Sequence, residues 1–125
     1  MTDHALILIV EDNEKNMKLA RDVLQFNGFR TLEAVTAEQG LTLAAEHHPD
    51  LILMDIQLPG MDGITALRCL RDDAATAGIK VVALTALAMA SDRERFVSAG
   101  FDGYLSKPIS VRELPSQVRA LLGQR

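Results

Sequence analysis

The chain has 125 residues, of which 48% are hydrophobic and 24% charged, and its formal net charge is −4. This length suits one compact domain, residues 1–125, whose core needs neither disulfide bonds nor a structural metal. The acidic balance and the lack of a basic stretch argue against a surface for nucleic acid or for an anionic membrane. No apolar run approaches the roughly 20 residues of a membrane span, and a single cysteine forms no internal disulfide, so we expect a cytoplasmic protein.

The first half of the chain alternates apolar runs with segments of helical period. Residues 6–10 are continuously hydrophobic, which predicts a strand buried on both faces of a sheet. A helix is expected over 13–27, with Gly28 as its stop, and a weaker strand over 30–34. A second helix is expected over 36–48, because a threonine opens this segment and a proline follows it directly.

The second half repeats this alternation. Three further strands are expected, at 51–55, 80–84 and 103–105. The turn-rich segment PGMDG precedes a helix whose Ile64, Leu67 and Leu70 are expected to face inward, and another helix is expected over 89–99.

The last helix opens on Ser110-Val-Arg-Glu113, which has the pattern of a capping box. Apolar residues recur here at helical spacing and are expected to face the core: Val111, Leu114, Val118, Leu121 and Leu122. Pro115 conflicts with a regular first turn, because proline lacks a backbone donor.

Five strands that alternate with five helices predict an α/β fold, a doubly wound (βα)5 sheet of five parallel strands covered on both faces. In such sheets, ligands bind at the carboxyl ends of the strands. The residues that follow or end the strands include three acids, a hydroxyl and a lysine: Glu11, Asp12, Asp55, Thr85 and Lys107. We expect these side chains to meet at one rim of the sheet.

The three carboxylates would repel one another unless a cation lies between them. Mg²⁺ fits best, because it accepts one or two carboxylates, retains several waters and takes phosphate oxygens as further ligands. We expect Asp12 and Asp55 to be direct ligands, Glu11 to act through water, and the main-chain oxygen of Gln57 to be a further ligand. The alternative is that Asp12 or Asn13 merely caps the helix that follows, whereas Asp55, at the end of a buried strand, has no helix to cap.

Asp55 is the candidate nucleophile, since a carboxylate can form an aspartyl-phosphate when cations offset the charge of the transferring group. Lys107 offers a flexible positive charge for Asp55 and a bound phosphate, or else it is a solvent-facing turn residue. Thr85 offers a hydroxyl to a phosphate oxygen, or else caps a helix. The Lys107–Pro108 peptide bond is a candidate for the cis form, although only about 5–6% of bonds before proline are cis.

Four stretches carry a resemblance to a known family: LILIVEDNEKNMKLA, PDLILMDIQLPGMDG, VVALTALAM and GFDGYLSKPIS. Over essentially its whole length, the chain resembles the response-regulator receiver family, CheY-like in fold, and especially its single-domain members. The resemblance implies the strand order 2-1-3-4-5, a phosphoaccepting Asp55, and a Mg²⁺ site formed by Glu11, Asp12, Asp55 and the main-chain oxygen of Gln57. It also implies a switch hydroxyl, a switch aromatic and a phosphate-binding lysine before a cis proline, at Thr85, Tyr104, Lys107 and Pro108.

The resemblance further implies partners. A histidine kinase or a histidine phosphotransfer protein would donate the phosphoryl group, and a monomer would signal through protein contacts, for instance to a regulated kinase. Phosphorylation is expected to move Thr85 and Tyr104 and so to alter the surface of the fourth helix, fifth strand and fifth helix. Alternatively, Tyr104 is a packed strand aromatic. The chain would be no enzyme beyond assisting its own phosphorylation and dephosphorylation.

Three other functions stay open at this point. A phosphatase of the haloacid-dehalogenase type also uses an aspartyl nucleophile, but it needs an acid two residues later, where this chain has Gln57. A degenerate receiver would bind partners without being phosphorylated, although all the pocket residues are present. The chain would also fit a receiver cut from a larger hybrid kinase, but its starting methionine and its end soon after the last helix lead us to expect a complete protein.

Overall fold

The computed structural model describes residues 5–86 and 90–123, which contain one five-stranded sheet and five helices. The strands are β1 (Leu6–Val10), β2 (Arg30–Ala34), β3 (Leu51–Asp55), β4 (Lys80–Thr85) and β5 (Gly103–Ser106). The helices are α1 (Glu14–Phe26), α2 (Ala37–His47), α3 (Gly63–Asp72), α4 (Ala90–Ala99) and α5 (Glu113–Leu122). All neighbouring strands are parallel and their order is β2-β1-β3-β4-β5. The predicted fold class and strand order are therefore confirmed.

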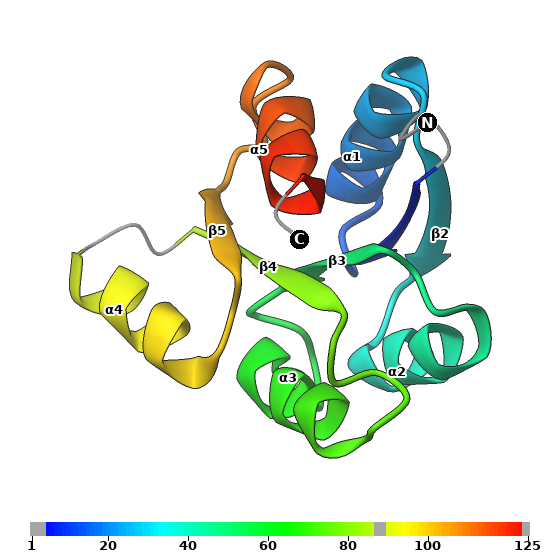
Figure 1. Cartoon of the computed structure of the whole chain (residues 1–125). Coiled ribbons are helices and arrows are strands. Elements are labelled where there is room, and N and C mark those ends of the chain that lie inside the picture. Colours follow the sequence, from blue (N-terminus) through cyan, green and yellow to red (C-terminus); the bar gives the residue numbers. More distant parts are fainter. Residues whose placement is uncertain (1–4, 87–89, 124–125) are drawn as a thin grey trace.

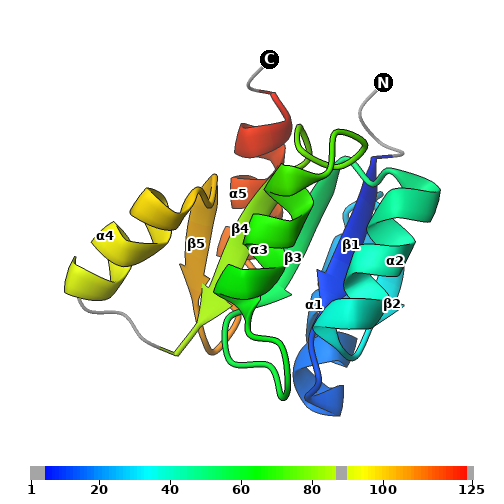
Figure 2. The same cartoon turned by 90° about the horizontal axis from the view of Figure 1, so that it is seen from below.

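The helices cover both faces of the sheet. Helices α1 and α5 lie on one face, and α2, α3 and α4 lie on the other (Figure 1). Alternate residues of each central strand point into opposite apolar layers, so that Ile7 and Ile9 face α1 and α5 while Leu8 and Val10 face α2 and α3. Because both faces of β1 are buried, its sequence is continuously apolar rather than alternating. All strand pairs are parallel, as the arrows of β1, β3 and β4 in Figure 2 illustrate, so the carboxyl ends of the strands share one edge.

Helix starts follow local sequence signals. Asn13 and Thr36 each accept a hydrogen bond from the backbone amide three residues later, at 3.0 and 3.1 Å, and so cap α1 and α2. Asp62 caps α3 in the same way, at 2.8 Å. The predicted start of the fourth helix, Met89, lies outside the described residues.

The predicted start of the last helix is wrong by a few residues. The helix begins at Glu113, and Val111, expected in the core, is 62% exposed. Pro115 gives the physical reason: in a helix that included Val111, Pro115 would have to donate to the Val111 carbonyl, which its ring cannot do. Of the capping box, the structure retains the bond from the Glu113 amide to Ser110 Oγ, at 3.1 Å, which closes a turn ahead of the helix. The other four apolar residues of the predicted stripe are buried.

Arg71, near the end of α3, ties together the edge of the sheet opposite to the carboxyl ends. Its Nη1 donates to the carbonyls of Ala77 and Ile79, at 3.0 and 2.6 Å. Its Nη2 donates to the carbonyl of Gly100 and to Asp102 Oδ2, at 3.1 and 2.9 Å. One side chain thus joins α3, the segment before β4 and the segment before β5.

We expect Arg71→Lys to lower the free energy of unfolding by about 1–2 kcal/mol, because a lysine ammonium group cannot reproduce the four hydrogen bonds that the planar guanidinium group donates. Urea denaturation measures this difference. The matched control is Arg68→Lys, an exposed change on the same helix, which should leave the free energy of unfolding within about 0.5 kcal/mol of the wild type. Equal stability of the two variants would contradict the joining role of Arg71.

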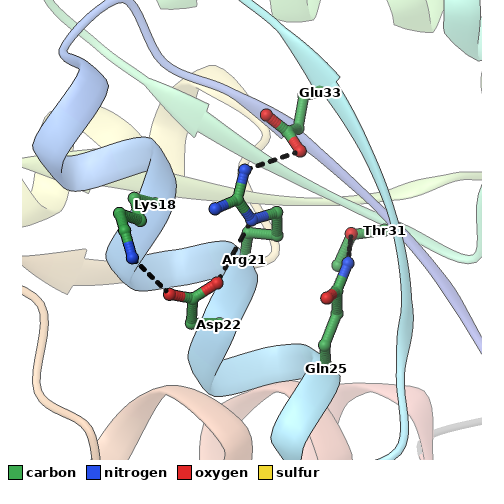
Figure 3. Close-up of polar contacts among 6 residues, drawn as sticks. All are labelled: Lys18, Arg21, Asp22, Gln25, Thr31 and Glu33. Atoms are coloured by element: carbon green, nitrogen blue, oxygen red, sulfur yellow. Dashed lines mark hydrogen bonds and ion pairs between the residues drawn. The ribbon is translucent and has the colours of Figure 1, made fainter.

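Polar contacts also join the outer side of α1 to the edge strand β2 (Figure 3). Arg21 contacts Asp22 Oδ1 at 3.2 Å and Glu33 Oε2 at 3.4 Å. Gln25 donates to Thr31 Oγ1 at 2.8 Å. Exposed ion pairs each contribute at most about 1 kcal/mol, so the buried apolar stripe of α1 contributes more to its attachment than these contacts do.

Candidate functional site

Three of the residues predicted to meet do so at the carboxyl edge of the sheet. Glu11 follows β1, Asp55 ends β3 and Lys107 follows β5. Lys107 Nζ lies 2.8 Å from Asp55 Oδ2 and 3.0 Å from Glu11 Oε1. Glu11 and Asp55 are only 1% and 3% exposed, so the lysine offsets two charges that are largely removed from water.

Asp12 completes an acidic cluster with these two carboxylates. One oxygen from each of Glu11, Asp12 and Asp55 lies within 4.8 Å of the other two. The helix cap is Asn13, so capping does not occupy the Asp12 side chain. Glu11 Oε2 accepts a hydrogen bond from the Asn13 amide at 3.1 Å, whereas the buried Oε1 forms none with the described residues and has only the ion pair with Lys107. Three oxygen donors, one of them buried without a hydrogen bond, fit a hard divalent cation such as Mg²⁺.

The cluster perturbs the titration of two of its members. Burial, helped by the neighbouring Asp55 carboxylate, raises the pKa of Glu11 from 4.5 to about 7, against the lowering effect of Lys107. Burial also acts to lower the pKa of Lys107, but its contacts with the Asp55 and Glu11 carboxylates outweigh that effect and raise the pKa above its usual value. The lysine therefore stays charged at neutral pH.

Backbone contacts hold Asp55 and Lys107 in place. The Gln57 amide donates to Asp55 Oδ1 at 2.9 Å, so both oxygens of that carboxylate have partners; the Gln57 side chain is exposed. The Lys107 amide donates to the Thr85 carbonyl at 2.8 Å, which extends the pairing of β4 and β5 by one residue. The Lys107–Pro108 peptide bond is cis.

The two predicted switch residues lie on neighbouring strands. Thr85 is the last residue of β4 and is 1% exposed. Tyr104, on β5, is half-buried and packs against the apolar layer of α2, α3 and α4. Arg93 of α4 donates from Nε to the Tyr104 hydroxyl at 2.6 Å, and its guanidinium carbon lies 5.0 Å from the ring centroid. The sequence interpretation missed Arg93, because a contact between two elements leaves no local pattern.

Comparison with known proteins gives a consistent result. The family described as "Response regulator receiver domain" matches residues 7–119. The polar-differentiation response regulator DivK of Brucella ovis is 47% identical over 117 residues, which cover 94% of this chain and 95% of that protein.

Solved structures agree with this. The receiver domain of the sensor histidine kinase PA1611 from Pseudomonas aeruginosa, described with a magnesium ion coordinated in its active site cleft, is 34% identical with a TM-score of 0.89, covering 97% of this chain and 99% of that one. CheY4 of Vibrio cholerae, 21% identical over 94% of this chain and 98% of its own, has a TM-score of 0.89 and attests the fold alone. Because the family matches residues 7–119 and the chain is 47% identical to DivK of Brucella ovis, the chain belongs to the response-regulator receiver domain family.

Proposed function

We propose that Asp55 is the phosphoacceptor through which this receiver domain works as a switch in a two-component phosphorelay. The observation that carries the proposal is the contact of Lys107 Nζ with both Asp55 and Glu11, which come from three separate strand ends. A carboxylate that is buried, backed by a lysine and beside two further acids has the surroundings of a metal-assisted phosphoryl acceptor.

We propose Mg²⁺ as the cofactor, with Asp12, Asp55 and the main-chain oxygen of Gln57 as direct ligands and Glu11 acting through water. The acidic cluster and the Glu11 oxygen that accepts no hydrogen bond support this, as does the magnesium described in the related PA1611 receiver. When bound, the ion supplies charge neutralisation for the oxygens of the transferring phosphoryl group.

The chain's own residues then carry the transfer. An Asp55 carboxylate oxygen attacks the phosphorus of a phosphohistidine, the phosphorus–nitrogen bond breaks, and the imidazole leaves with the electron pair and takes a proton from solvent. An acyl phosphate on Asp55 results. Lys107, charged at neutral pH, offsets the negative charge on Asp55 and on the incoming group, so that most of the catalysis is positioning and electrostatics.

The phosphoryl group adds about −1.5 to −2 charges beside Thr85 and Lys107. We expect the Thr85 hydroxyl to donate to a phosphate oxygen and Tyr104 to follow into the space that it leaves. This would change the surface of α4, β5 and α5, where a downstream protein such as a regulated kinase would bind. The donor would be a histidine kinase or a histidine phosphotransfer protein, and no nucleic acid is involved in the proposed function.

Arg93→Ala should release Tyr104 from its present position. The lost contact of a half-exposed aromatic with a charged donor is worth about 1 kcal/mol, or roughly fivefold in a two-state equilibrium of the ring. Because the chain has one tyrosine and no tryptophan, its intrinsic fluorescence reports Tyr104 alone. We expect acrylamide quenching of the Tyr104 fluorescence in the unphosphorylated protein to change in Arg93→Ala. Quenching should stay as in the wild type in Arg95→Ala, because the Arg95 guanidinium lies over Phe96 rather than Tyr104. Equal quenching in both variants would contradict a holding role for Arg93.

Intact-mass measurement after incubation with acetyl phosphate and Mg²⁺ tests the proposed acceptor. The wild type should gain the mass of one phosphoryl group, and Asp55→Asn should gain none. Asp72→Asn, which removes the same charge from the exposed end of α3, should behave as the wild type. A wild type that gains no mass would favour a receiver that binds without phosphorylation, and steady release of phosphate from many substrates would favour a phosphatase.

The proposal also covers where the protein acts and its domain and oligomeric state. Within the described ranges, none of the helices has the length and apolar character to cross a bilayer, and we propose a cytoplasmic site of action. We also propose that residues 1–125 form a single receiver domain that acts as a monomer; the share of DivK that the chain covers, 95%, supports the domain assignment.

A further inference from the structure

Gly63 lies where α3 comes closest to the end of β3. It is the first residue of α3, it is buried, and its amide donates to the Ile56 carbonyl at 3.1 Å. A Cβ atom on residue 63 would lie 2.8 Å from the carbonyl oxygen of Asp55 and 2.9 Å from the Cα of Ile56. Both neighbours are backbone atoms, so neither can rotate away, and a side chain here forces α3 and β3 apart.

The choice of glycine at this position has no local explanation. Glycine in a helix is less favourable than alanine by up to about 1 kcal/mol. Gly63 does not have the positive φ of Gly28, Gly60 or Gly100, so its backbone conformation is open to alanine. The remaining reason for glycine at position 63 is the close approach of its Cα to the backbone of Asp55 and Ile56.

That backbone orients the acceptor carboxylate. The carbonyl that a Cβ would strike belongs to Asp55 itself, and the Gln57 amide, two residues on, holds Asp55 Oδ1 at 2.9 Å. The other oxygen, Oδ2, is 2.8 Å from Lys107 Nζ. A shift of a few tenths of an ångström in the Asp55–Ile56 peptide therefore changes both contacts of the carboxylate.

We propose that Gly63 is a positioning residue for phosphoryl transfer: its lack of a side chain lets α3 hold the Asp55–Gln57 backbone in the geometry that aims the Asp55 carboxylate. The inference rests on the proposed function of Asp55 and adds to it a residue that touches neither the phosphoryl group nor the metal. A misplacement of about 1 Å at a reacting group can slow a reaction about a hundredfold, so a shift of a few tenths of an ångström is expected to slow it about tenfold.

The test compares Gly63→Ala with two controls. Gly78→Ala makes the same chemical change where a Cβ meets nothing within 4 Å. Leu70→Ala removes buried apolar atoms from the far end of α3 and so lowers stability without touching Asp55. Three quantities are measured for each variant: the rate of phosphoryl uptake from acetyl phosphate, the free energy of unfolding, and, in protein free of Mg²⁺, the NMR shift of the Gln57 amide.

We expect Gly63→Ala alone to shift the Gln57 amide and to slow phosphoryl uptake about tenfold. If Gly63→Ala takes up the phosphoryl group at the wild-type rate, with or without a loss of stability, the inference is overturned. It is also overturned if Leu70→Ala slows phosphoryl uptake as much as Gly63→Ala does. If Gly63→Ala does not fold, Asp62→Ala loosens the same helix start by removing its cap, and an unchanged Gln57 amide in that variant overturns the inference as well. Absence of phosphoryl uptake in the wild type itself would instead refute the proposed function of Asp55.

Discussion

Lys107→Met should lower the free energy of unfolding by about 3 kcal/mol at pH 8 in protein free of Mg²⁺. The substitution leaves Asp55 and Glu11, both nearly inaccessible, without the cation that lies 2.8 and 3.0 Å from them. Removing one partner of a buried ion pair destabilises a protein more than the pair itself contributes, because a charge stays behind in a poorly solvated place. Lys107 thus stabilises the fold through the same contacts that would assist phosphoryl transfer.

The pH dependence of this loss follows from the two shifted groups. The pKa of Lys107 is raised in the folded protein, so the stability that comes from its own protonation is complete below its ordinary pKa and declines only at higher pH. The titration of Lys107 therefore causes no difference between pH 5 and pH 8, and any difference comes from Glu11. At pH 5, Glu11, with a pKa of about 7, is already protonated, and only the contact with Asp55 is lost on substitution. The penalty measured by urea denaturation should therefore be smaller at pH 5 than at pH 8.

Lys80→Met provides the control, since it removes the same charge from the start of β4, at the opposite edge of the sheet. Its effect on the free energy of unfolding should be small and nearly independent of pH. If Lys107→Met and Lys80→Met gave similar losses at both pH values, the close ion pairs of Lys107 would not be what stabilises this rim.

Much of the fold could be predicted because its signals are local. The central strands are continuously apolar, and they are continuously apolar because helices cover both of their faces. Asn13 and Thr36 cap helices with side chains that reach only three residues ahead. Even the error at Val111 had a local cause, since the proline four residues later excludes Val111 from the helix.

The site could be predicted only to the extent that topology brings strand ends together. Placing acids and a lysine after parallel strands is enough to predict that they meet, because the carboxyl ends share one edge. The hydrogen bond from Arg93 to Tyr104 depends on how α4 packs against β5, and the close approach of Gly63 to Asp55 depends on how α3 packs against β3. Packing between elements far apart in the sequence leaves no periodic pattern.

Glu11→Gln should raise the free energy of unfolding of the Mg²⁺-free protein at pH 8 by about 2–3 kcal/mol. The folded protein holds a proton on Glu11 up to about pH 7, whereas the unfolded chain loses it near pH 4.5. Between these values the folded state binds more protons than the unfolded state, so the stability of the wild type falls as pH rises. Glutamine resembles the protonated form at every pH, and the variant therefore avoids that fall.

Urea denaturation across pH 4.5 to 8, with and without Mg²⁺, measures this difference. Without the ion, the two stability curves should meet near pH 4.5 and separate up to pH 7, while Glu14→Gln, an exposed acid in the first turn of α1, should run parallel to the wild type. Adding Mg²⁺ at pH 8 should stabilise the wild type more than Glu11→Gln, because binding to the folded state alone raises stability and the variant offers one anionic oxygen donor fewer. Parallel curves for Glu11→Gln and the wild type would mean that Glu11 is ionised throughout. Lys107 and the Asn13 amide would then offset the cost of burying the Glu11 carboxylate, and its burial would not destabilise the Mg²⁺-free protein at pH 8.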